Sequence, residues 1–315
     1  MSAPLVSVIC TAFNHADYIR ETLDGFLAQR CDFPIEVIVH DDASKDGTAE
    51  IIREYAALHP HLFVPILQPE NVYSRGGRPW FICFERARGK YIAICEGDDV
   101  WTDPLKLQRQ VNDLETHPDR MLSFHDVSVI DDSGGVFAKY KRYSDMAWNG
   151  LDPGRDRYDL HDLIRASLCP TCSVVFRKPE PFVVPEWIRS LPFADQPLFI
   201  WVARGGSIQC EPGELAAYRR HEASSSRTAA GTDRFTVGGI RMHLALLREL
   251  PVDYHDTIRS ALRLKVRALL SLRALDPELR SEVQRAMPGL LPMEAMARTW
   301  ARWKGYLRTL RGAWR

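Results

Sequence analysis

The sequence predicts an α/β fold in which a mostly parallel, twisted sheet is flanked by helices and followed by a helical C-terminal extension. Short apolar runs alternate with segments of helical periodicity over residues 5–130, and this alternation is typical of a parallel sheet with covering helices. From Phe235 onward Leu, Ala and Arg dominate in a helical pattern. We therefore expect one domain at residues 1–231 and a helical extension at residues 232–315.

Each apolar run in the first part is expected to form one strand. The expected strands are 5–11, 35–40, 63–67, 91–95 and 121–130. Helices are expected between them at 18–28, 51–58, 80–87 and 104–117. Asp46 or Thr48 can cap the second helix, and Pro104 suits the first turn of the fourth.

Residues 131–230 are less regular. A turn is expected at 131–135, a strand at 172–177 and a helix at 197–203. A further strand at 207–210 leads towards a basic segment at 218–221, and the small residues of 224–231 indicate a loop.

The composition is ordinary for a globular protein. The 315 residues include 41 basic and 41 acidic side chains, so the balanced charge gives no argument for a nucleic-acid partner. No signal-peptide pattern is seen, and no stretch approaches the roughly 18 apolar residues of a membrane span. Seven scattered cysteines are expected to be structural, including Cys169 and Cys172, whose spacing can also indicate zinc or a redox pair. The expected compartment is the cytoplasm.

Two acidic clusters follow predicted strands. Asp41 and Asp42 follow the second strand, and Glu96, Asp98 and Asp99 follow the fourth. Ligands of an open α/β sheet bind at the carboxyl ends of its strands, so we expect both clusters at one edge. Like-charged pairs about 4 Å apart cost on the order of 4 kcal/mol at an effective dielectric constant near 20. A divalent cation removes that repulsion, and oxygen ligands favour Mg²⁺ or Mn²⁺. Either cluster alone could simply form a turn, but the two together favour a site.

Three motifs in this order resemble glycosyltransferase family 2. They are SVICTAFN at 7–14, VHDDASKDGT at 39–48 and EGDDVW at 96–101. The resemblance covers roughly residues 4–225 and implies the GT-A fold, with residues 1–231 as the catalytic domain. It also implies an inverting transferase that moves a sugar from a nucleotide-sugar donor, with UDP-sugar expected, to a hydroxyl of a glycan or lipid-linked acceptor.

The resemblance assigns the first two motifs to the nucleotide base. Asp41 would bind the base, with Asp42 beside it in the family's Asp-Asp motif. Thr11, Phe13 and Asn14 would form part of the base pocket. The family's frequent Pro-Thr-Tyr-Asn is Thr-Ala-Phe-Asn here, so this pocket is expected to differ in detail.

The third motif would serve the ribose and the metal. Glu96, which replaces the family's first Asp, or Asp98 would reach the ribose. Asp98 or Asp99 would hold Mg²⁺ or Mn²⁺, which bridges the diphosphate of the donor. Which of the two adjacent aspartates is the direct metal ligand stays open at this point.

An inverting transfer also needs a general base. The segment 193–199 (FADQPLF) matches the family position and nominates Asp195, although Ala194 stands where an acidic residue often precedes the base. Asp195 could instead be the N-cap of a helix, and both roles are compatible. The segment 218–221 resembles a Tyr-Arg-x-His motif that would place Arg219 and His221 near the diphosphate or metal, whereas an exposed basic patch is the alternative.

The last eighteen residues form a separate feature. Residues 298–315 hold six basic and no acidic side chains, with Trp and Leu recurring at intervals of three and four. This pattern is typical of a basic amphipathic helix that lies on an anionic membrane, here the inner face of the plasma membrane. A helix that packs its apolar stripe on the domain is equally compatible.

Two other functions remain open. A sugar nucleotidyltransferase also uses an α/β sheet and a metal, but it usually needs a Gly-rich basic loop after the first strand. The loop 11–15 (TAFNH) contains no Gly, Arg or Lys. The remaining alternative is a non-catalytic nucleotide-binding or scaffold protein. Four other histidines show no metal-ligand spacing and are expected to be ordinary polar or packing residues, namely His15, His40, His125 and His161.

Overall fold

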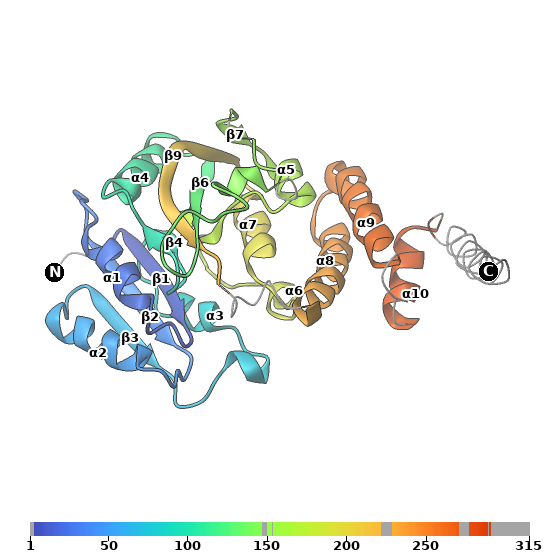
Figure 1. Ribbon diagram of the computed structural model, residues 1–315. Coiled ribbons are helices and arrows are strands. Elements are labelled where there is room, and N and C mark those ends of the chain that lie inside the picture. The colour runs from blue at the N-terminus through green and yellow to red at the C-terminus, as the bar shows by residue number, and fades with distance from the viewer. Residues whose placement is uncertain are drawn as a thin grey trace. The chain divides into compact units, whose positions relative to one another are not determined.

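The computed structural model describes residues 3–146, 150–152, 154–221, 229–270, 277–288 and 290 (Figure 1). The chain divides into two compact units, Met1–Arg227 and Thr228–Arg315. The first holds the sheet and the second is helical. Each is described by itself.

The first half of the sheet is parallel. Its strands are β1 (Val6–Ala12), β2 (Ile35–Asp41), β3 (Phe63–Leu67) and β4 (Tyr91–Ile94). The connecting helices are α1 (Ile19–Leu27), α2 (Thr48–Leu58) and α3 (Pro79–Phe84). All of these elements lie within about two residues of the predicted ones, except that α2 begins three residues early and α3 ends three residues early. Strand order is β3-β2-β1-β4, so the chain first builds to one side of β1 and then crosses to the other.

That reversal at β1 creates a topological switch point between β1 and β4, which pair in parallel. Right-handed crossovers place α1 and α2 on one face of the sheet and α3 on the other. The loops after β1 and β4 therefore diverge at the same edge. This is where open α/β sheets bind ligands.

The second half of the sheet is mixed. Its strands are β5 (Val100–Trp101), β6 (Arg120–Ile130), β7 (Arg157–Tyr158), β8 (Val175–Arg177) and β9 (Ser207–Arg219). The order continues from β4 as β8-β6-β9-β5, with β7 beside β9. β6 and β9 are parallel, whereas β8 is antiparallel to both β4 and β6. A three-residue strand carries too little pattern for its direction to be predicted.

Helices and short turns connect these strands. They are α4 (Lys106–Thr116), α5 (Leu160–Arg165), α6 (Glu186–Arg189), α7 (Asp195–Ala203) and the 3₁₀ turns η1 (Tyr73–Arg75), η2 (Tyr143–Asp145) and η3 (Thr171–Ser173). α7 is apolar all round and buried from its second residue to its end, because it packs against both β6 and α5.

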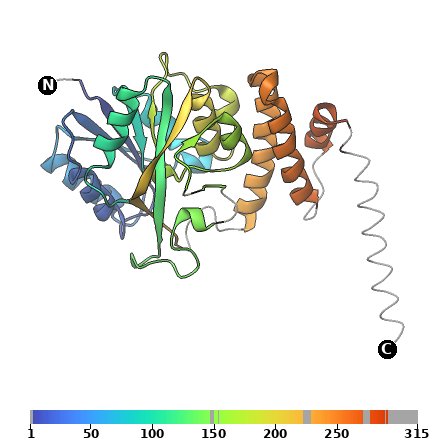
Figure 2. The same cartoon turned by 90° about the horizontal axis from the view of Figure 1, so that it is seen from above.

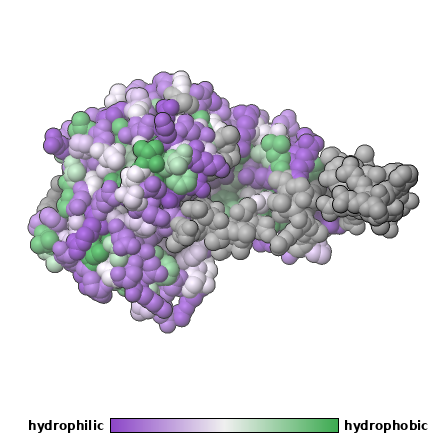
Figure 3. All heavy atoms as spheres, viewed as in Figure 1, coloured by the Kyte–Doolittle hydropathy of each residue, from purple (hydrophilic) through white to green (hydrophobic). Residues whose placement is uncertain are grey.

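The core lies on both faces of the central strands. Val8 and Ile9 of β1, Ile38 of β2 and Ile94 of β4 are all fully buried. Continuous apolar runs of this kind are what a sheet covered on both faces requires. On the molecular surface viewed in Figure 3, hydrophobic residues are scattered among hydrophilic ones, which is ordinary for a folded domain.

The second unit consists of α8 (Ala229–Glu249), the 3₁₀ turn η5 (Val252–Tyr254), α9 (His255–Leu270) and α10 (Pro277–Ala286). α8 and α9 lie side by side (Figure 2). Ile240, Leu262 and Val283, one from each helix, are fully or almost fully buried in a shared apolar cluster. The helical extension predicted from residue 232 is therefore present over its described part. The predicted basic helix at 298–315 lies outside the described residues. None of the described helices combines the length and apolarity needed to cross a bilayer.

Candidate active site

The loops after β1 and β2 are joined by hydrogen bonds at the switch-point edge. The Asn14 backbone donates to Ser44 Oγ at 2.8 Å, and the Lys45 backbone donates to Asn14 Oδ1 at 2.9 Å. Asn14 has a positive φ of 55°, which Asn tolerates better than most residues. Two other predicted base-pocket residues accompany it, the half-buried Thr11 and the exposed Phe13. The predicted pocket residues thus lie together at this edge.

Asp41 and Asp42 differ in what their carboxylates contact. Asp42 accepts hydrogen bonds from the backbone N–H groups of Val72 and Tyr73 at 2.7 and 3.0 Å, so it anchors the loop after β3. Asp41 accepts one bond, from the Ser44 backbone at 3.1 Å. Its Oδ1 is buried and has no hydrogen-bond partner among the described residues. Asp41 therefore retains an oxygen that a ligand can use.

The loop 96–99 is fixed tightly against β1 and α1. The Gly97 N–H donates to the Thr11 carbonyl at 2.9 Å, and Thr22 Oγ1 donates to the carbonyls of Gly97 and Asp99 at 3.0 and 2.7 Å. A Cβ on Gly97 would lie only 2.9 Å from Ala12 Cβ. Only glycine fits here, which explains its place between the acidic residues.

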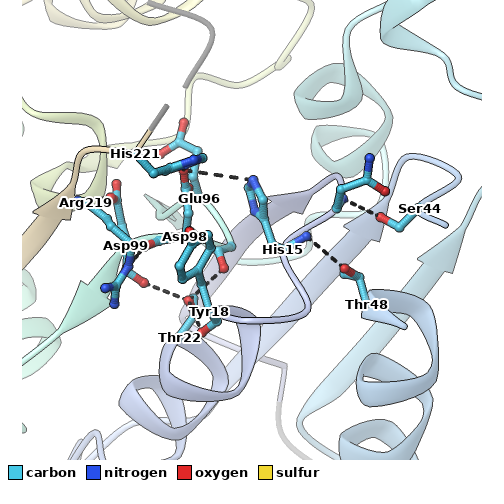
Figure 4. A network of polar contacts seen from close by, with 12 residues as sticks. His15, Tyr18, Thr22, Ser44, Thr48, Glu96, Asp98, Asp99, Arg219 and His221 are labelled. Carbon is cyan, nitrogen blue, oxygen red and sulfur yellow. Dashed lines mark hydrogen bonds and ion pairs between the residues drawn. The ribbon is translucent and has the colours of Figure 1, made fainter. Parts of the chain in front are cut away.

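Asp98 and Asp99 point to different surroundings (Figure 4). Asp99 is 2% exposed, and its Oδ1 accepts the Arg219 backbone N–H at 2.8 Å. Asp98 Oδ2 lies 2.9 Å from His221 Nε2 and 3.9 Å from His15 Nε2. Asp98 therefore faces the loop after β1 and the end of β9, while Asp99 is occupied in holding β9.

The three carboxyl groups of this loop differ in the direction in which their pKa values are shifted. Burial, together with repulsion from Asp99 and Asp98, raises the pKa of Glu96. Burial and Asp98 likewise raise the pKa of Asp99. Burial alone would also raise the pKa of Asp98, but the His221 hydrogen bond and the nearby imidazoles outweigh it and lower that pKa. Asp98 is thus the one of the three whose pKa is lowered, and Glu96 Oε2 is buried with no partner among the described residues.

Arg219 is a buried brace beneath this loop. Its Nε donates to the Asp98 carbonyl at 2.9 Å, Nη1 to the Asp131 carbonyl at 3.0 Å and Nη2 to Glu21 at 2.5 Å. Its guanidinium also lies 4.9 Å from the centre of the Tyr18 ring. The residue is 2% exposed. Sequence reasoning expected Arg219 near the diphosphate or metal; the structure places it next to Asp98, with its donors directed at protein acceptors.

His15 was not expected at the site, yet it joins Asp98 and His221 there. One ligand atom from each of the three residues lies within 4.8 Å of the others. Burial lowers the pKa of His15, against the opposing influence of Asp98. The neutral imidazole is the form that binds metals. The sequence signal that could have indicated His15 is its place in the loop after β1, at the switch point. Its spacing from other possible ligands in the sequence gives no such indication.

The site offers one carboxylate and two imidazoles to a cation. Imidazole and carboxylate are both established ligands of divalent transition metals. Burial and mutual repulsion raise the pKa values of Glu96 and Asp99, and a nearby cation would reduce that repulsion. The residues present therefore fit a divalent cation beside Asp98.

Asp195 is the first residue of α7, and the N-cap position belongs to Ala194, which makes no side-chain cap bond. The alternative that Asp195 serves as the N-cap is therefore not what the structure has. Burial raises the pKa of Asp195, and Asp195 in turn contributes to raising that of Glu96. The Asp195 carboxyl group of α7 is thus close enough to the 96–99 loop to influence the pKa of Glu96 electrostatically.

Lys106, at the start of α4, is a buried cation beside Trp101 that was not singled out from the sequence. It is fully buried. Its Nζ donates to Gln110 Oε1 at 2.7 Å and lies 4.4 Å from the centre of the Trp101 ring. Trp101 donates its Nε1–H to the Cys172 carbonyl. Burial lowers the pKa of Lys106 to about 7.

The free energy of unfolding should rise with pH above about 7 because of Lys106. The native ammonium loses its proton near pH 7, whereas lysine in the unfolded chain keeps it to about pH 10.4. Unfolding therefore takes up a proton in this window, and stability increases with pH. Urea unfolding at about pH 7 and pH 9 should show a smaller gain for Lys106→Met than for the wild type. Equal gains in both proteins would contradict the assignment.

The two cysteines with metal-like or redox-like spacing are structural. Cys169 and Cys172 are buried and free, as are Cys10, Cys83 and Cys95. Burial raises the pKa of both thiols well above the ordinary value, so neither has the thiolate character of a redox pair.

Comparison with known proteins identifies the family. The profile described as glycosyl transferase family 2 matches residues 7–180. An uncharacterized protein of Mycobacterium tuberculosis (strain ATCC 25618 / H37Rv) is 41% identical over 230 residues, which cover 73% of this chain and 62% of the relative. The chain thus spans less than two thirds of that relative's length.

Solved structures share the fold. The TarS protein of S. aureus in complex with UDP superposes with a TM-score of 0.62 at 18% identity, covering 90% of this chain and 81% of TarS. The mannosyltransferase PcManGT of Pyrobaculum calidifontis, in complex with GDP-Man and Mn²⁺, gives a TM-score of 0.50 at 18% identity, covering 98% of this chain and 86% of that one. At this identity the likeness concerns the fold, which is the predicted GT-A fold. Because the family profile matches more than half of the sequence, the chain belongs to glycosyl transferase family 2.

Proposed function

We propose that this chain is an inverting, divalent-cation-dependent glycosyltransferase that moves a sugar from a UDP-sugar to a hydroxyl of a glycan or lipid-linked acceptor. One observation carries the proposal. The unpaired, buried oxygens of Asp41 and Glu96 and the charged carboxylate of Asp98 belong to loops that meet at the switch-point edge. Buried polar atoms without a partner are costly, and a nucleotide with hydroxyl and N–H donors satisfies them.

The donor nucleotide would lie across the loops after β1, β2 and β4. Asp41 Oδ1 would accept the N3–H of a uracil base, and Glu96 Oε2 would accept a ribose hydroxyl. Phe13, which is 44% exposed, would offer an apolar face to the base. TarS, which shares the fold, was crystallised with UDP, and this supports UDP among the possible nucleotides.

Asp98 and His221 would hold the cation beside the donor diphosphate. A bound divalent cation supplies positive charge that offsets the negative charge developing on the leaving diphosphate. Arg219 would keep Asp98 in place through the Asp98 carbonyl rather than contact the phosphates. Mn²⁺ in PcManGT supports a divalent cation for this fold.

Asp195 would act as the general base. Its carboxylate takes the proton of the acceptor hydroxyl as the hydroxyl oxygen bonds to the anomeric carbon. The bond from that carbon to the diphosphate oxygen breaks on the opposite face, and the electron pair leaves with the nucleoside diphosphate. Attack from the opposite face inverts the anomeric configuration.

A two-stage experiment tests the proposal. A thermal-shift panel of UDP-, GDP- and dTDP-sugars, each with and without Mn²⁺, should show the largest stabilisation for a UDP-sugar with the cation, because a ligand stabilises the native state by mass action. Acceptor-dependent release of UDP then distinguishes a transferase from a binding protein. Binding without release on any glycan or lipid-linked acceptor supports the scaffold alternative, and formation of a nucleotide-sugar from a sugar phosphate and UTP supports a nucleotidyltransferase.

A further inference from the structure

We propose that His15 is a direct ligand of the cation, so that Asp98, His221 and His15 form a two-histidine, one-carboxylate site that selects Mn²⁺ and similar transition metals over Mg²⁺. This inference rests on the proposed cation dependence and adds the ligand set and the class of cation. The three side chains come from separate parts of the fold, namely the loop after β1, the loop after β4 and the end of β9.

The distances between the donor atoms fit one ion. Bonds of about 2.1 Å to a six-coordinate cation place neighbouring donor atoms about 3 Å apart and opposite ones about 4.2 Å apart. His221 Nε2 and Asp98 Oδ2 are 2.9 Å apart, and His15 Nε2 and Asp98 Oδ2 are 3.9 Å apart. All three donor atoms lie within 4.8 Å of one another. A shift of the His15 ring by less than about 1 Å completes the set.

The backbone of His15 is held firmly at the start of α1. Its N–H donates to Thr48 Oγ1 at 2.9 Å, and its carbonyl accepts the N–H groups of Tyr18 and Ile19 at 2.9 and 2.8 Å. The ring contacts the rings of Tyr18 and His221 edge-on, with centroids 6.3 and 6.1 Å apart, and Nδ1 lies on the Gly97 side, 3.1 Å from the position that a Cβ would take there. Nδ1 thus faces the wall of the loop and Nε2 faces Asp98. This is how a preorganised ligand is oriented.

A purely structural role does not account for this orientation. At 3.9 Å, His15 Nε2 is too far from Asp98 for a hydrogen bond. Its other nitrogen, Nδ1, is buried and has no hydrogen-bond partner among the described residues. The side chain is 16% exposed, so water does little to solvate it. A cation between Nε2 and Asp98 would bind Nε2, which is too far from Asp98 for a direct hydrogen bond.

The donor atoms determine the cation. Mg²⁺ favours oxygen ligands and gives up its water reluctantly, so two imidazoles suit it poorly. Transition metals accept imidazole nitrogen readily, and their affinity for mixed nitrogen and oxygen sites rises from Mn²⁺ through Co²⁺. Three protein ligands leave three of six positions open, enough for two diphosphate oxygens and one water. The site therefore favours Mn²⁺ or Co²⁺ while leaving room for the donor.

Mn²⁺ binding to the full chain tests the ligand assignment without relying on activity. Electron paramagnetic resonance measures free Mn²⁺ in a titration, and pulsed measurements detect the ¹⁴N nuclei of bound imidazoles. We expect the wild type to bind Mn²⁺ more tightly than Mg²⁺ and to show two coupled imidazole nitrogens. His15→Gln, which keeps the volume and polarity of the side chain, should weaken Mn²⁺ binding by at least about 10- to 100-fold and show one coupled imidazole.

Controls separate a ligand role from a packing role. His59 is a partly buried histidine at the end of α2 that contacts Phe63, and His59→Gln should leave the Mn²⁺ affinity unchanged. His15→Gln should weaken Mg²⁺ binding much less than Mn²⁺ binding, whereas misfolding would weaken both. Mn²⁺ affinity within about two-fold of wild type and two coupled imidazoles in His15→Gln would overturn the proposal.

The outcome also separates this inference from the proposed function. If the wild type binds Mn²⁺ through two imidazoles but transfers no sugar from any donor, the ligand assignment stands and the transferase proposal fails. If UDP-sugar transfer proceeds with one imidazole bound, the transferase proposal stands and the His15 assignment fails.

Discussion

Asp195→Asn lowers kcat by about 10²- to 10⁴-fold, the range for loss of a positioned general base, while binding of UDP with Mn²⁺ stays close to wild type. The amide cannot take the proton of the acceptor hydroxyl. Because Asp195 lies in the first turn of α7 and not in the motif loop that faces His221, its replacement leaves the cation ligands in place. Steady-state kinetics and calorimetric titration with UDP measure the two quantities separately.

Glu186→Gln is the matched control for this change. Glu186 is also the first residue of a short helix, α6, but it is exposed, so its neutralisation should leave kcat unchanged. Full activity in Asp195→Asn would remove Asp195 from the mechanism.

The acid limb of the pH profile gives a second, independent readout of the same base. Burial raises the pKa of Asp195 above the ordinary aspartate value, and a base must be deprotonated to act. Activity is therefore expected to fall, as pH decreases, at a higher pH than an exposed aspartate would produce. The residual activity of Asp195→Asn should lack this limb.

Asp98→Asn is expected to reduce kcat/KM by about 10²- to 10³-fold, comparable to the loss of a donor that stabilises developing charge, and to weaken Mn²⁺ binding in parallel. The amide can still accept the hydrogen bond from His221 Nε2, so local structure is retained. The substitution removes the negative charge of Asp98. The raised pKa values of Glu96 and Asp99 make those two groups poor replacements for it. Mn²⁺ titrations at several pH values measure this directly.

Asp99→Asn separates the two adjacent aspartates. Its carboxylate accepts the Arg219 backbone N–H, a bond that the amide oxygen of Asn can also accept, so we expect the free energy of unfolding and the Mn²⁺ affinity both to stay close to the wild-type values. The reverse result, with cation binding lost in Asp99→Asn and kept in Asp98→Asn, would show that Asp99 holds the cation and that Asp98 does not.

Sequence reasoning reached the fold because the signals were local. The central strands are continuous apolar runs, and their ends were predicted within about two residues, as in β3 at Phe63–Leu67. The long β9 was predicted only at 207–210, although it extends over Ser207–Arg219. The segment Glu211-Pro212-Gly213-Glu214, which is exposed from Pro212 to Glu214, interrupts the apolar pattern before the buried residues Leu215, Ala216 and Ala217.

The site was predicted in outline, but the orientation of its side chains was not. Adjacent residues such as Asp98 and Asp99 have identical local signals. The end of β9 distinguishes them, because the Arg219 N–H donates to Asp99 whereas His221 contacts Asp98. For the same reason Arg219 could be placed near the metal but not recognised as a brace. His15 was passed over because a single histidine after a strand has no spacing to interpret.

The arrangement of β9 also determines when the centre can form during synthesis. The parallel half of the sheet, from β3 to β4, is complete once residue 94 has emerged from the ribosome. Arg219, however, is the last residue of β9, and His221 follows it by two residues. Domains generally fold as units, so the first unit, whose acidic loop is held by Arg219, can complete its fold only after β9 has been made. That loop gains its brace and its second imidazole only after more than a hundred further residues have been translated.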